Sequence, residues 1–270
     1  MVAANGGIAI LGGGNLGQAL ARGWAKAGRY RPGEISLIRR QAGKLAEFAE
    51  AGYAVGTDLA AAVRSRRTIV LAVQPQQLEA LMQEIRGALK PEHRIISVVS
   101  GVGTAQIRAM AGMAVAVVRA MPNTAVSIGE SMTCLAAAPD AAEALKEAVS
   151  LFDLVGRTLI IAEEMMIPAT ALCACGVAFF LRAVRAASQG GIEIGFHPEE
   201  ALLLAAQTAK GSAALLLMED HHPESQIDRV TTPRGCTIAG LNEMEHQGFS
   251  SAMIKGILVS AEKAARLYQG

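Results

Sequence analysis

Short apolar runs alternate with amphipathic stretches along the chain up to residue 162. Runs such as residues 8–11 and 68–73 are almost entirely apolar, which is typical of strands buried on both faces. Between the runs, stretches such as residues 75–89 place apolar side chains at helical spacing. This alternation predicts an α/β fold with a mostly parallel, doubly wound sheet of the Rossmann type. The expected strands are residues 8–11, 34–38, 68–73, 95–99, 115–118, 132–136 and 158–162.

From residue 163 onward almost every stretch has helical periodicity. Gly190 and Gly191 are expected to end the first of four long helices. The chain therefore divides into an α/β domain, residues 1–162, and an all-α domain, residues 163–270. The expected helices are residues 165–188, 197–219, 237–246 and 250–268.

The longest apolar run, residues 168–181, is too short to span a bilayer and predicts a buried helix. We therefore expect no membrane segment. The C-terminal helices carry more apolar surface than a chain of 270 residues needs to bury internally. This excess predicts a homodimer formed through these helices, with a higher oligomer left open.

The composition, the net charge and the spacing of cysteines and histidines exclude several classes of function. The chain is 51% hydrophobic and 18% charged, as in a folded protein, and its net charge of +1 gives no reason to expect nucleic-acid binding. No basic region followed by an apolar one opens the sequence, so no secretory signal is expected. The four cysteines have neither disulfide-framework nor zinc spacing, and the five histidines show no metal-ligand spacing. We expect a cytoplasmic protein with reduced thiols and no metal.

The glycine-rich stretch after the first strand has the order that binds a dinucleotide pyrophosphate. Gly12 permits a tight turn, Gly14 lets the backbone approach the phosphates, and Gly17 lets the helix pack close to the strand. The start of the helix that follows offers unpaired N–H groups to an anion, and Asn15 and Leu16 in the same stretch are further cofactor-binding candidates. Residues 1–162 are therefore expected to be a dinucleotide-binding domain. A purely structural turn in another α/β fold is the alternative interpretation.

The second strand bears on the choice of cofactor. NAD enzymes usually place an acid there, about 20 residues after the glycines, to hold the ribose 2′-hydroxyl. This chain has Arg39 and Arg40 instead, which favours the 2′-phosphate of NADP. NAD stays possible, because the two arginines are also compatible with a solvated surface pair.

Other cofactor-binding candidates follow the carboxyl ends of later strands, where the crevice of such a sheet opens. Asn123 could supply an amide to the site, although an ordinary loop residue would have the same spacing. The candidates at these positions are Val73, Pro75, Ser100, Gly101 and Asn123.

A loop of small and hydroxyl residues leads into the helix expected from residue 237. The backbone N–H groups of Gly235, Cys236 and Thr237 would be free at the start of this helix and suit a carboxylate. Thr232 in the same loop is a further substrate-binding candidate. The simplest alternative is an ordinary Ser/Thr helix cap.

These motifs, in this order, resemble those of the pyrroline-5-carboxylate reductases. The similarity runs through the glycine loop, Ala72-Val73-x-Pro75, residues 118–124 and above all residues 230–241, Val-Thr-Thr-Pro-x-Gly-x-Thr-Ile-Ala-Gly-Leu. The resemblance implies a Rossmann domain, a helical dimerisation domain and reduction of the cyclic imine pyrroline-5-carboxylate to L-proline. It also implies that the Thr237 hydroxyl is catalytic and meets the substrate nitrogen, while Gly235 and Cys236 bind the carboxylate.

The chain departs from that family at several positions. Residues 172–179 are Leu-Cys-Ala-Cys-Gly-Val-Ala-Phe where the family usually has Leu-Ser-Gly-Ser-Gly-Pro-Ala-Tyr, and thiols are weaker hydrogen-bond partners than hydroxyls. Gln74 replaces a usual Lys, and Arg234 replaces a usual Gly. A reductase of a related cyclic imine or small carbonyl acid, and a catalytically weak NADP sensor, are therefore alternatives. A β-hydroxyacid dehydrogenase would need a helical Lys, and the context of Lys210 does not match.

Overall fold

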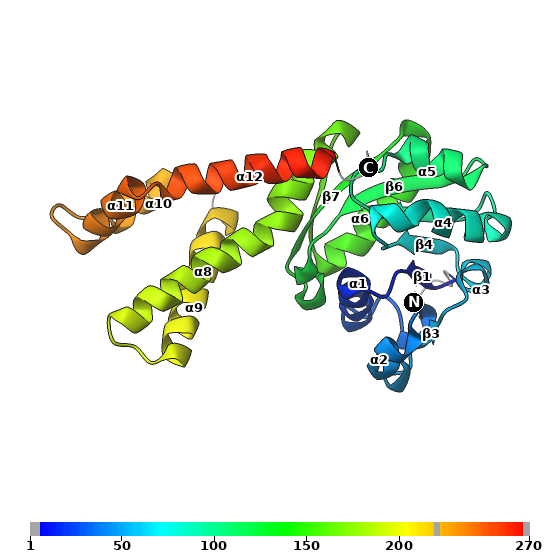
Figure 1. Cartoon of the computed structure of the whole chain (residues 1–270), viewed down its shortest axis with the longest axis horizontal. Helices are drawn as coiled ribbons and strands as arrows, with labels where there is room; N and C mark the ends of the chain where they lie inside the picture. The colour runs from blue at the N-terminus through cyan, green and yellow to red at the C-terminus, as the bar shows by residue number, and fades with distance from the viewer. Residues whose placement is uncertain (1–5, 219–221, 267–270) are drawn as a thin grey trace. The chain divides into compact units, whose positions relative to one another are not determined.

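The computed structural model describes residues 6–218 and 222–266 (Figure 1). Two compact units are present. One contains the described residues up to Ala174 together with those from Ser260 onward, and the other spans Cys175–Val259. The functional boundary expected after residue 162 stays a prediction.

Within the described residues of the first unit, eight strands form one sheet in the order β3-β2-β1-β4-β5-β6-β7-β8. The pairs are parallel apart from the antiparallel β6–β7 pair, which confirms the mostly parallel, doubly wound sheet. The edge strand β3 was not predicted, because three half-exposed residues give no periodic signal. The strands are β1 (Ile8–Leu11), β2 (Ile35–Ile38), β3 (Ala54–Gly56), β4 (Thr68–Leu71), β5 (Arg94–Ser97), β6 (Ala116–Met121), β7 (Ser131–Ala137) and β8 (Gly156–Ile160).

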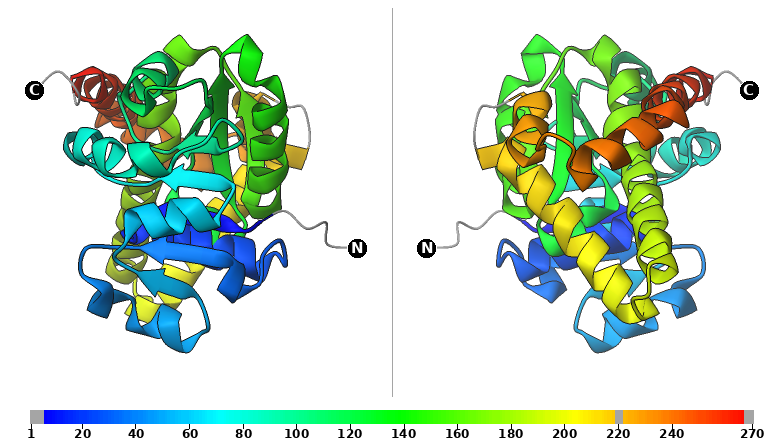
Figure 2. Two further views of the ribbon diagram at one scale, coloured as in Figure 1. Left: turned by 90° about the vertical axis from the view of Figure 1, so that its right-hand side faces the viewer. Right: turned by 90° about the vertical axis from the view of Figure 1, so that its left-hand side faces the viewer.

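Helices cover both faces of this sheet, and successive residues of β1 show why (Figure 2). Ile8 and Ile10 pack with α1 (Asn15–Lys26) and α6 (Ala142–Phe152) on one face. Ala9 and Leu11 pack with helices on the other face, and all four side chains are fully buried. The helices of that second face are α3 (Leu59–Ser65), α4 (Pro75–Ile85) and α5 (Thr104–Ala111). A short helix, α2 (Ala46–Glu50), also packs on the first face.

Trp24 fastens α1 to α6. Its ring is fully buried and meets Phe152 edge to face, with ring centroids 5.5 Å apart. The indole Nε1 donates a hydrogen bond of 2.9 Å to the Leu151 carbonyl, so the polar atom of this large side chain is satisfied. The first helix after the glycine turn is thereby fixed at its far end as well.

The second unit is helical, as expected. Its helices are α8 (Gly176–Glu193), α9 (Pro198–Met218), α10 (Pro223–Val230), α11 (Cys236–His246) and the greater part of α12 (Phe249–Ala265). Helix α10 was not predicted, and the loop expected before residue 237 begins only after Val230. The predicted helix ends at Glu219 and Tyr268, and the histidine His221, lie outside the described residues.

The long helix predicted from residue 165 is broken into three pieces and does not stop at Gly190. It consists of α7 (Met166–Ala169), a π-helical turn (Thr170–Cys175) and α8, which runs through both glycines. A Cβ on Gly191 would lie 3.1 Å from the Cβ of Ala201 in α9, so this glycine permits close helix packing. The chain turns only at Gly195, whose φ of +110° is in the region that glycine favours.

The prediction that residues 168–181 are buried holds for only part of the run in the single chain, since Ala169, Thr170 and Ala171 are buried. Phe180 is 63% exposed and Leu181 62% exposed, and further leucines of α9, such as Leu203, are also exposed. By length and composition alone, two described helical stretches, Glu163–Glu193 and Pro198–Met218, could cross a membrane. The described residues of the single chain leave these apolar faces uncovered, and exposed faces of this kind usually mark a site of interaction with another molecule.

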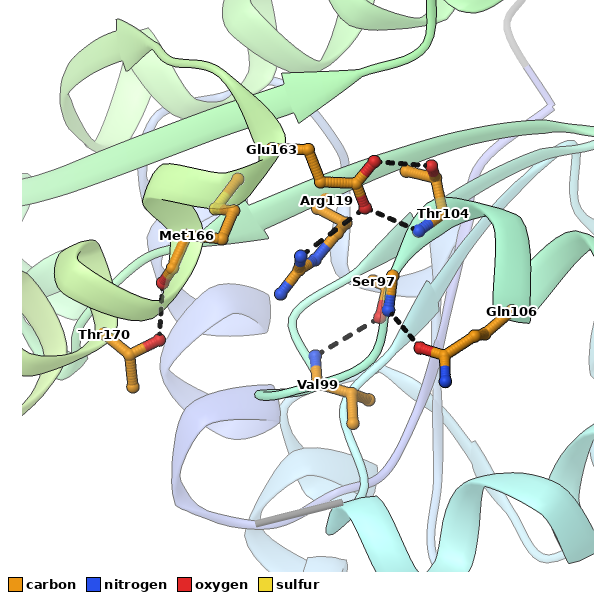
Figure 3. A network of polar contacts seen from close by, with 9 residues as sticks. Ser97, Val99, Thr104, Gln106, Arg119, Glu163, Met166 and Thr170 are labelled. Carbon is orange, nitrogen blue, oxygen red and sulfur yellow. Dashed lines mark hydrogen bonds and ion pairs between the residues drawn. The ribbon is translucent and has the colours of Figure 1, made fainter. Parts of the chain in front are cut away.

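Glu163, at the start of the stretch Glu163–Glu193, forms polar contacts with α5 and with β6 (Figure 3). Glu163 accepts hydrogen bonds from the Thr104 backbone N–H at 2.6 Å and from the Thr104 hydroxyl at 2.8 Å. The guanidinium of Arg119, a buried residue of β6, lies 3.5 Å from the same carboxylate. Glu163 thus supplies the N-terminal cap of α5 from a distant part of the sequence.

Burial acts to raise the pKa of Glu163, but the hydrogen bonds from Thr104 and the charge of Arg119 outweigh it and hold the pKa below its usual value of 4.5. A carboxylate with a lower pKa in the folded chain stabilises the fold above the unfolded pKa. That contribution is lost as the pH falls through the folded pKa.

We expect Glu163→Ala to lower the free energy of unfolding by about 1–3 kcal/mol, because it removes a cap and a charged hydrogen bond. Glu163→Gln keeps an acceptor for Thr104 and loses the charge, so it should cost about 1 kcal/mol and reduce the loss of stability below pH 4.5. Denaturant unfolding between pH 3 and pH 7, in about unit steps, measures both effects.

Glu164→Gln is the matched control, since Glu164 is the neighbouring acid and is exposed. It should change stability by less than about 0.5 kcal/mol. Equal losses in the Glu163 and Glu164 variants would contradict the capping role.

Candidate functional site

The turn between β1 and α1 is held by the end of β2. The backbone N–H groups of Gly12 and Gly13 both donate to the Ile38 carbonyl, at 3.0 and 2.9 Å. Gly12 has a φ of +127°, and a Cβ there would lie 2.1 Å from the Ala72 carbonyl oxygen. A glycine is therefore required at this position by both conformation and space.

The other two glycines of the motif differ from each other. A Cβ on Gly17 would lie 2.0 Å from the Gly12 carbonyl oxygen, so Gly17 sets the close approach of α1 to the turn. A Cβ on Gly14 would meet nothing within 4 Å, and its extended backbone (φ −79°, ψ −170°) is open to any residue. The fold does not require a glycine at residue 14, but a ligand approaching the backbone there would.

The start of α1 fits an anion. Gly14 is its N-cap and contributes no side-chain hydrogen bond, and the first turn contains no acid. The N–H groups of the first turn, including those of Asn15 and Leu16, have no partner within the helix. These donors and the positive end of the helix dipole are the groups that hold a dinucleotide pyrophosphate.

Two side chains fix the glycine turn from outside it. Arg39 Nη1 and Gln18 Nε2 both donate to the Gly13 carbonyl, at 2.9 and 3.0 Å. The Arg39 guanidinium therefore lies against the turn, next to the exposed Arg40. The role of Gln18 was not predicted, because its position in a helical stretch gives no signal of a contact with the turn.

The crevice candidates gather at one edge of the sheet. The carboxyl end of β4 leads to Val73 and Pro75, and that of the neighbouring β5 to Ser100 and Gly101. Because β1, β4 and β5 are parallel, the glycine turn opens at this edge too. Val73, Pro75, Ser100 and Gly101 are all partly accessible.

The Asn123 side chain is already engaged within the protein. Its Oδ1 accepts a hydrogen bond from the Ala125 N–H at 3.0 Å, and its Nδ2 donates to the Cys173 carbonyl at 3.3 Å. The amide thus holds the π-helical turn beside the end of β6. This contact could not be read from the sequence, because the two residues are 50 positions apart.

The second unit contains the predicted substrate loop between α10 and α11. Gly235 is the N-cap of α11, without a side-chain cap or an acid in the first turn. The expectation that the Gly235 N–H is free is wrong, because it donates to the Thr232 carbonyl at 2.9 Å and closes the loop. The donors at the start of α11 are therefore those of Cys236 and Thr237.

Arg234 takes the left-handed backbone conformation, with a φ of +57°, beside Gly235. It is the one non-glycine residue with positive φ in the described ranges. The same ranges contain no group of three His, Cys, Asp or Glu side chains that could hold a metal ion.

Both halves of the chain match models of known protein families. Residues 7–101 match the family described as NADP oxidoreductase, coenzyme F420-dependent. Residues 163–267 match the family described as pyrroline-5-carboxylate reductase dimerisation.

Curated relatives extend the similarity over the whole chain. Pyrroline-5-carboxylate reductase 1 of Dictyostelium discoideum is 49% identical over 97% of this chain, which spans about half (50%) of that relative. Pyrroline-5-carboxylate reductase 2 of the same organism is 46% identical over 96% of this chain and 92% of its own length. The crystal structure of Plasmodium falciparum pyrroline carboxylate reductase with NADP bound shares the fold, with a TM-score of 0.89 at 23% identity over 98% of both chains. The chain belongs to the pyrroline-5-carboxylate reductase family.

Proposed function

We propose that this chain reduces 1-pyrroline-5-carboxylate to L-proline with NADPH by direct hydride transfer, the step of proline biosynthesis that forms the amino acid. The observation that carries the proposal is a pair of helix starts, at α1 and α11, each with a glycine N-cap and no acid in its first turn. One suits a pyrophosphate and the other a carboxylate. The family membership gives the two anions their identity.

Bound NADPH would supply the hydride that reduces the imine carbon. The backbone N–H groups of Cys236 and Thr237 would bind and orient the substrate carboxylate at the start of α11. The Thr237 hydroxyl would hydrogen-bond the ring nitrogen and hold it in line. Because a protonated imine accepts hydride readily, positioning by these groups would provide most of the rate acceleration.

Arg39 and Arg40 support NADPH as the preferred coenzyme. The end of β2 has two cations and no acid, and the Arg39 guanidinium already lies against the glycine turn. A ribose 2′-phosphate would meet two donors there, whereas a 2′-hydroxyl would lack its usual acidic partner. Tighter binding of NADH than of NADPH, measured by fluorescence titration, would contradict this preference.

We also propose that the chain is a cytoplasmic homodimer assembled through its C-terminal helices, with the functional division after residue 162. The dimerisation family match covers both helical stretches that could cross a membrane by composition alone. Exposed side chains such as Phe180, Leu181 and Leu203 suit a partner of the same composition. A monomer in sedimentation equilibrium at micromolar concentration, or recovery in a membrane pellet, would contradict this assembly.

Two glycine variants separate nucleotide binding from folding. Gly14→Ala should keep the stability of the natural chain, because a Cβ there meets nothing. It should weaken NADPH binding by at least about tenfold, since the methyl group would occupy the approach of the phosphates. Gly17→Ala should lower the free energy of unfolding by about 3 kcal/mol, because its Cβ would collide with the Gly12 carbonyl.

Thermal unfolding and fluorescence titration with NADPH, applied to both glycine variants, measure these effects. A Gly14→Ala protein that binds NADPH as tightly as the natural chain would show that the glycine turn is only structural.

The Thr237 hydroxyl should account for a measurable part of the catalysis. Thr237→Ala should lower kcat/KM for pyrroline-5-carboxylate by about 10- to 100-fold, as expected for one hydrogen bond to a charged group, and Thr237→Ser should restore most of it. The decrease in NADPH absorbance with pyrroline-5-carboxylate as substrate measures the rate.

Thr231→Ala provides the control in the same loop, because the Thr231 hydroxyl already donates to the Ile227 carbonyl at 2.8 Å. Its kcat/KM should stay within about threefold of the natural value. Tight NADPH binding without oxidation by any cyclic imine would instead favour the sensor alternative.

A further inference from the structure

Two cysteines far apart in the sequence lie side by side in the first unit. The sulfur atoms of Cys134, on β7, and Cys173, in the π-helical turn, are 3.7 Å apart. Cys134 is 4% exposed and belongs to a small apolar cluster with Met121, and Cys173 packs against that cluster. The pair lies within one compact unit, so its geometry does not depend on how the two units are arranged.

The backbone around the pair is fixed from both sides. Cys134 lies in the middle of β7, which pairs with β6 on one side and β8 on the other. The Cys173 carbonyl is held by the Asn123 amide at 3.3 Å. A disulfide has a sulfur–sulfur distance of about 2.05 Å, so the two sulfur atoms need to approach by less than about 2 Å. Side-chain rotation can supply most of that movement.

The two thiols differ in acidity. A hydrogen bond from Cys134 lowers the pKa of Cys173 to about 7, although burial acts to raise it. The same contact, together with burial, raises the pKa of Cys134. Cys173 is therefore the more acidic thiol of the pair, and the thiolate is the nucleophilic form.

We propose that Cys134 and Cys173 are a redox-active dithiol that a hydroperoxide oxidises to an intramolecular disulfide. This inference goes beyond the proposed reductase activity and does not depend on it. It assigns a modification site to Cys134 and Cys173, neither of which is among the residues of the proposed reductase site.

The oxidation takes place in two steps of ordinary thiol chemistry. The Cys173 thiolate attacks one oxygen of hydrogen peroxide, which breaks the O–O bond, forms a sulfenic acid and releases hydroxide. The Cys134 sulfur then attacks the Cys173 sulfur and displaces its hydroxyl group, and the Cys134 proton leaves with that group as water. The two thiols lose two electrons in total and the peroxide is reduced to water.

The disulfide would join β7 to the turn that leads into α8, across a sequence separation of 39 residues. A cross-link of this span restricts the unfolded chain, so the oxidised protein should unfold at a higher temperature than the reduced protein. It would also fix the turn whose carbonyl Asn123 holds.

Peptide mapping of the full chain tests the proposal. The reduced protein is freed of reductant, exposed to hydrogen peroxide near neutral pH, alkylated with iodoacetamide and digested without reduction. We expect one linked peptide pair that contains Cys134 and Cys173, with loss of two of the four thiols and full reversal by dithiothreitol. Alkylation of both residues after peroxide, oxidation of either without a cross-link, or a link to another cysteine would overturn the proposal.

Cysteine variants provide a second readout. Cys175→Ser and Cys236→Ser should form the same cross-link as the natural chain. Cys173→Ser should abolish it. Cys134→Ala removes the hydrogen bond that lowers the pKa of Cys173, so Cys173 should form a sulfenic acid more slowly than in the natural chain, and dimedone traps this acid. A cross-link that survives either of the last two substitutions would overturn the assignment. The mapping of the natural chain stays decisive if the buried Cys134→Ala variant does not fold.

Discussion

The close approach of α1 to the end of β1 is the constraint on which the nucleotide half of this protein depends. Only a hydrogen atom fits between Gly17 and the Gly12 carbonyl oxygen. This contact places the unpaired N–H groups of α1 at the carboxyl edge of the sheet, where the ends of β4 and β5 also lie. Trp24 fixes the same helix to α6, so its position is determined at both ends.

In the helical half, close packing between two helices occurs together with exposed apolar side chains. Its helices α8 and α9 pack closely because Gly191 leaves room for Ala201, yet large apolar side chains such as Leu203 stay exposed. An isolated soluble chain rarely leaves faces of this kind uncovered. Residues 163–267, which include these faces, match the family described as pyrroline-5-carboxylate reductase dimerisation, and the proposed homodimer would cover them.

Polar contacts over long sequence distances join the parts of the first unit. Glu163 caps α5 from 59 residues away, and Asn123 holds the Cys173 carbonyl from 50 residues away. Glu163 satisfies the Thr104 N–H, which has no partner within α5 because it lies in the first turn of that helix. The π-helical turn that Asn123 holds contains Cys173 and lies beside Cys134 on β7. The redox proposal therefore depends on the same local packing.

The sequence by itself determined seven of the eight strands of the described sheet, the glycine turn and the cationic end of β2, because burial periodicity and glycine requirements are local properties. It also carried the motif at residues 230–241. Only the tertiary structure decided that Gly191 continues a helix, since its role is to admit Ala201. The contact of the Asn123 amide with the Cys173 carbonyl and the pairing of Cys134 with Cys173 were decided there too. Hydrogen-bond partners and helix packing depend on residues far apart in the chain, and no local pattern specifies which of them will meet.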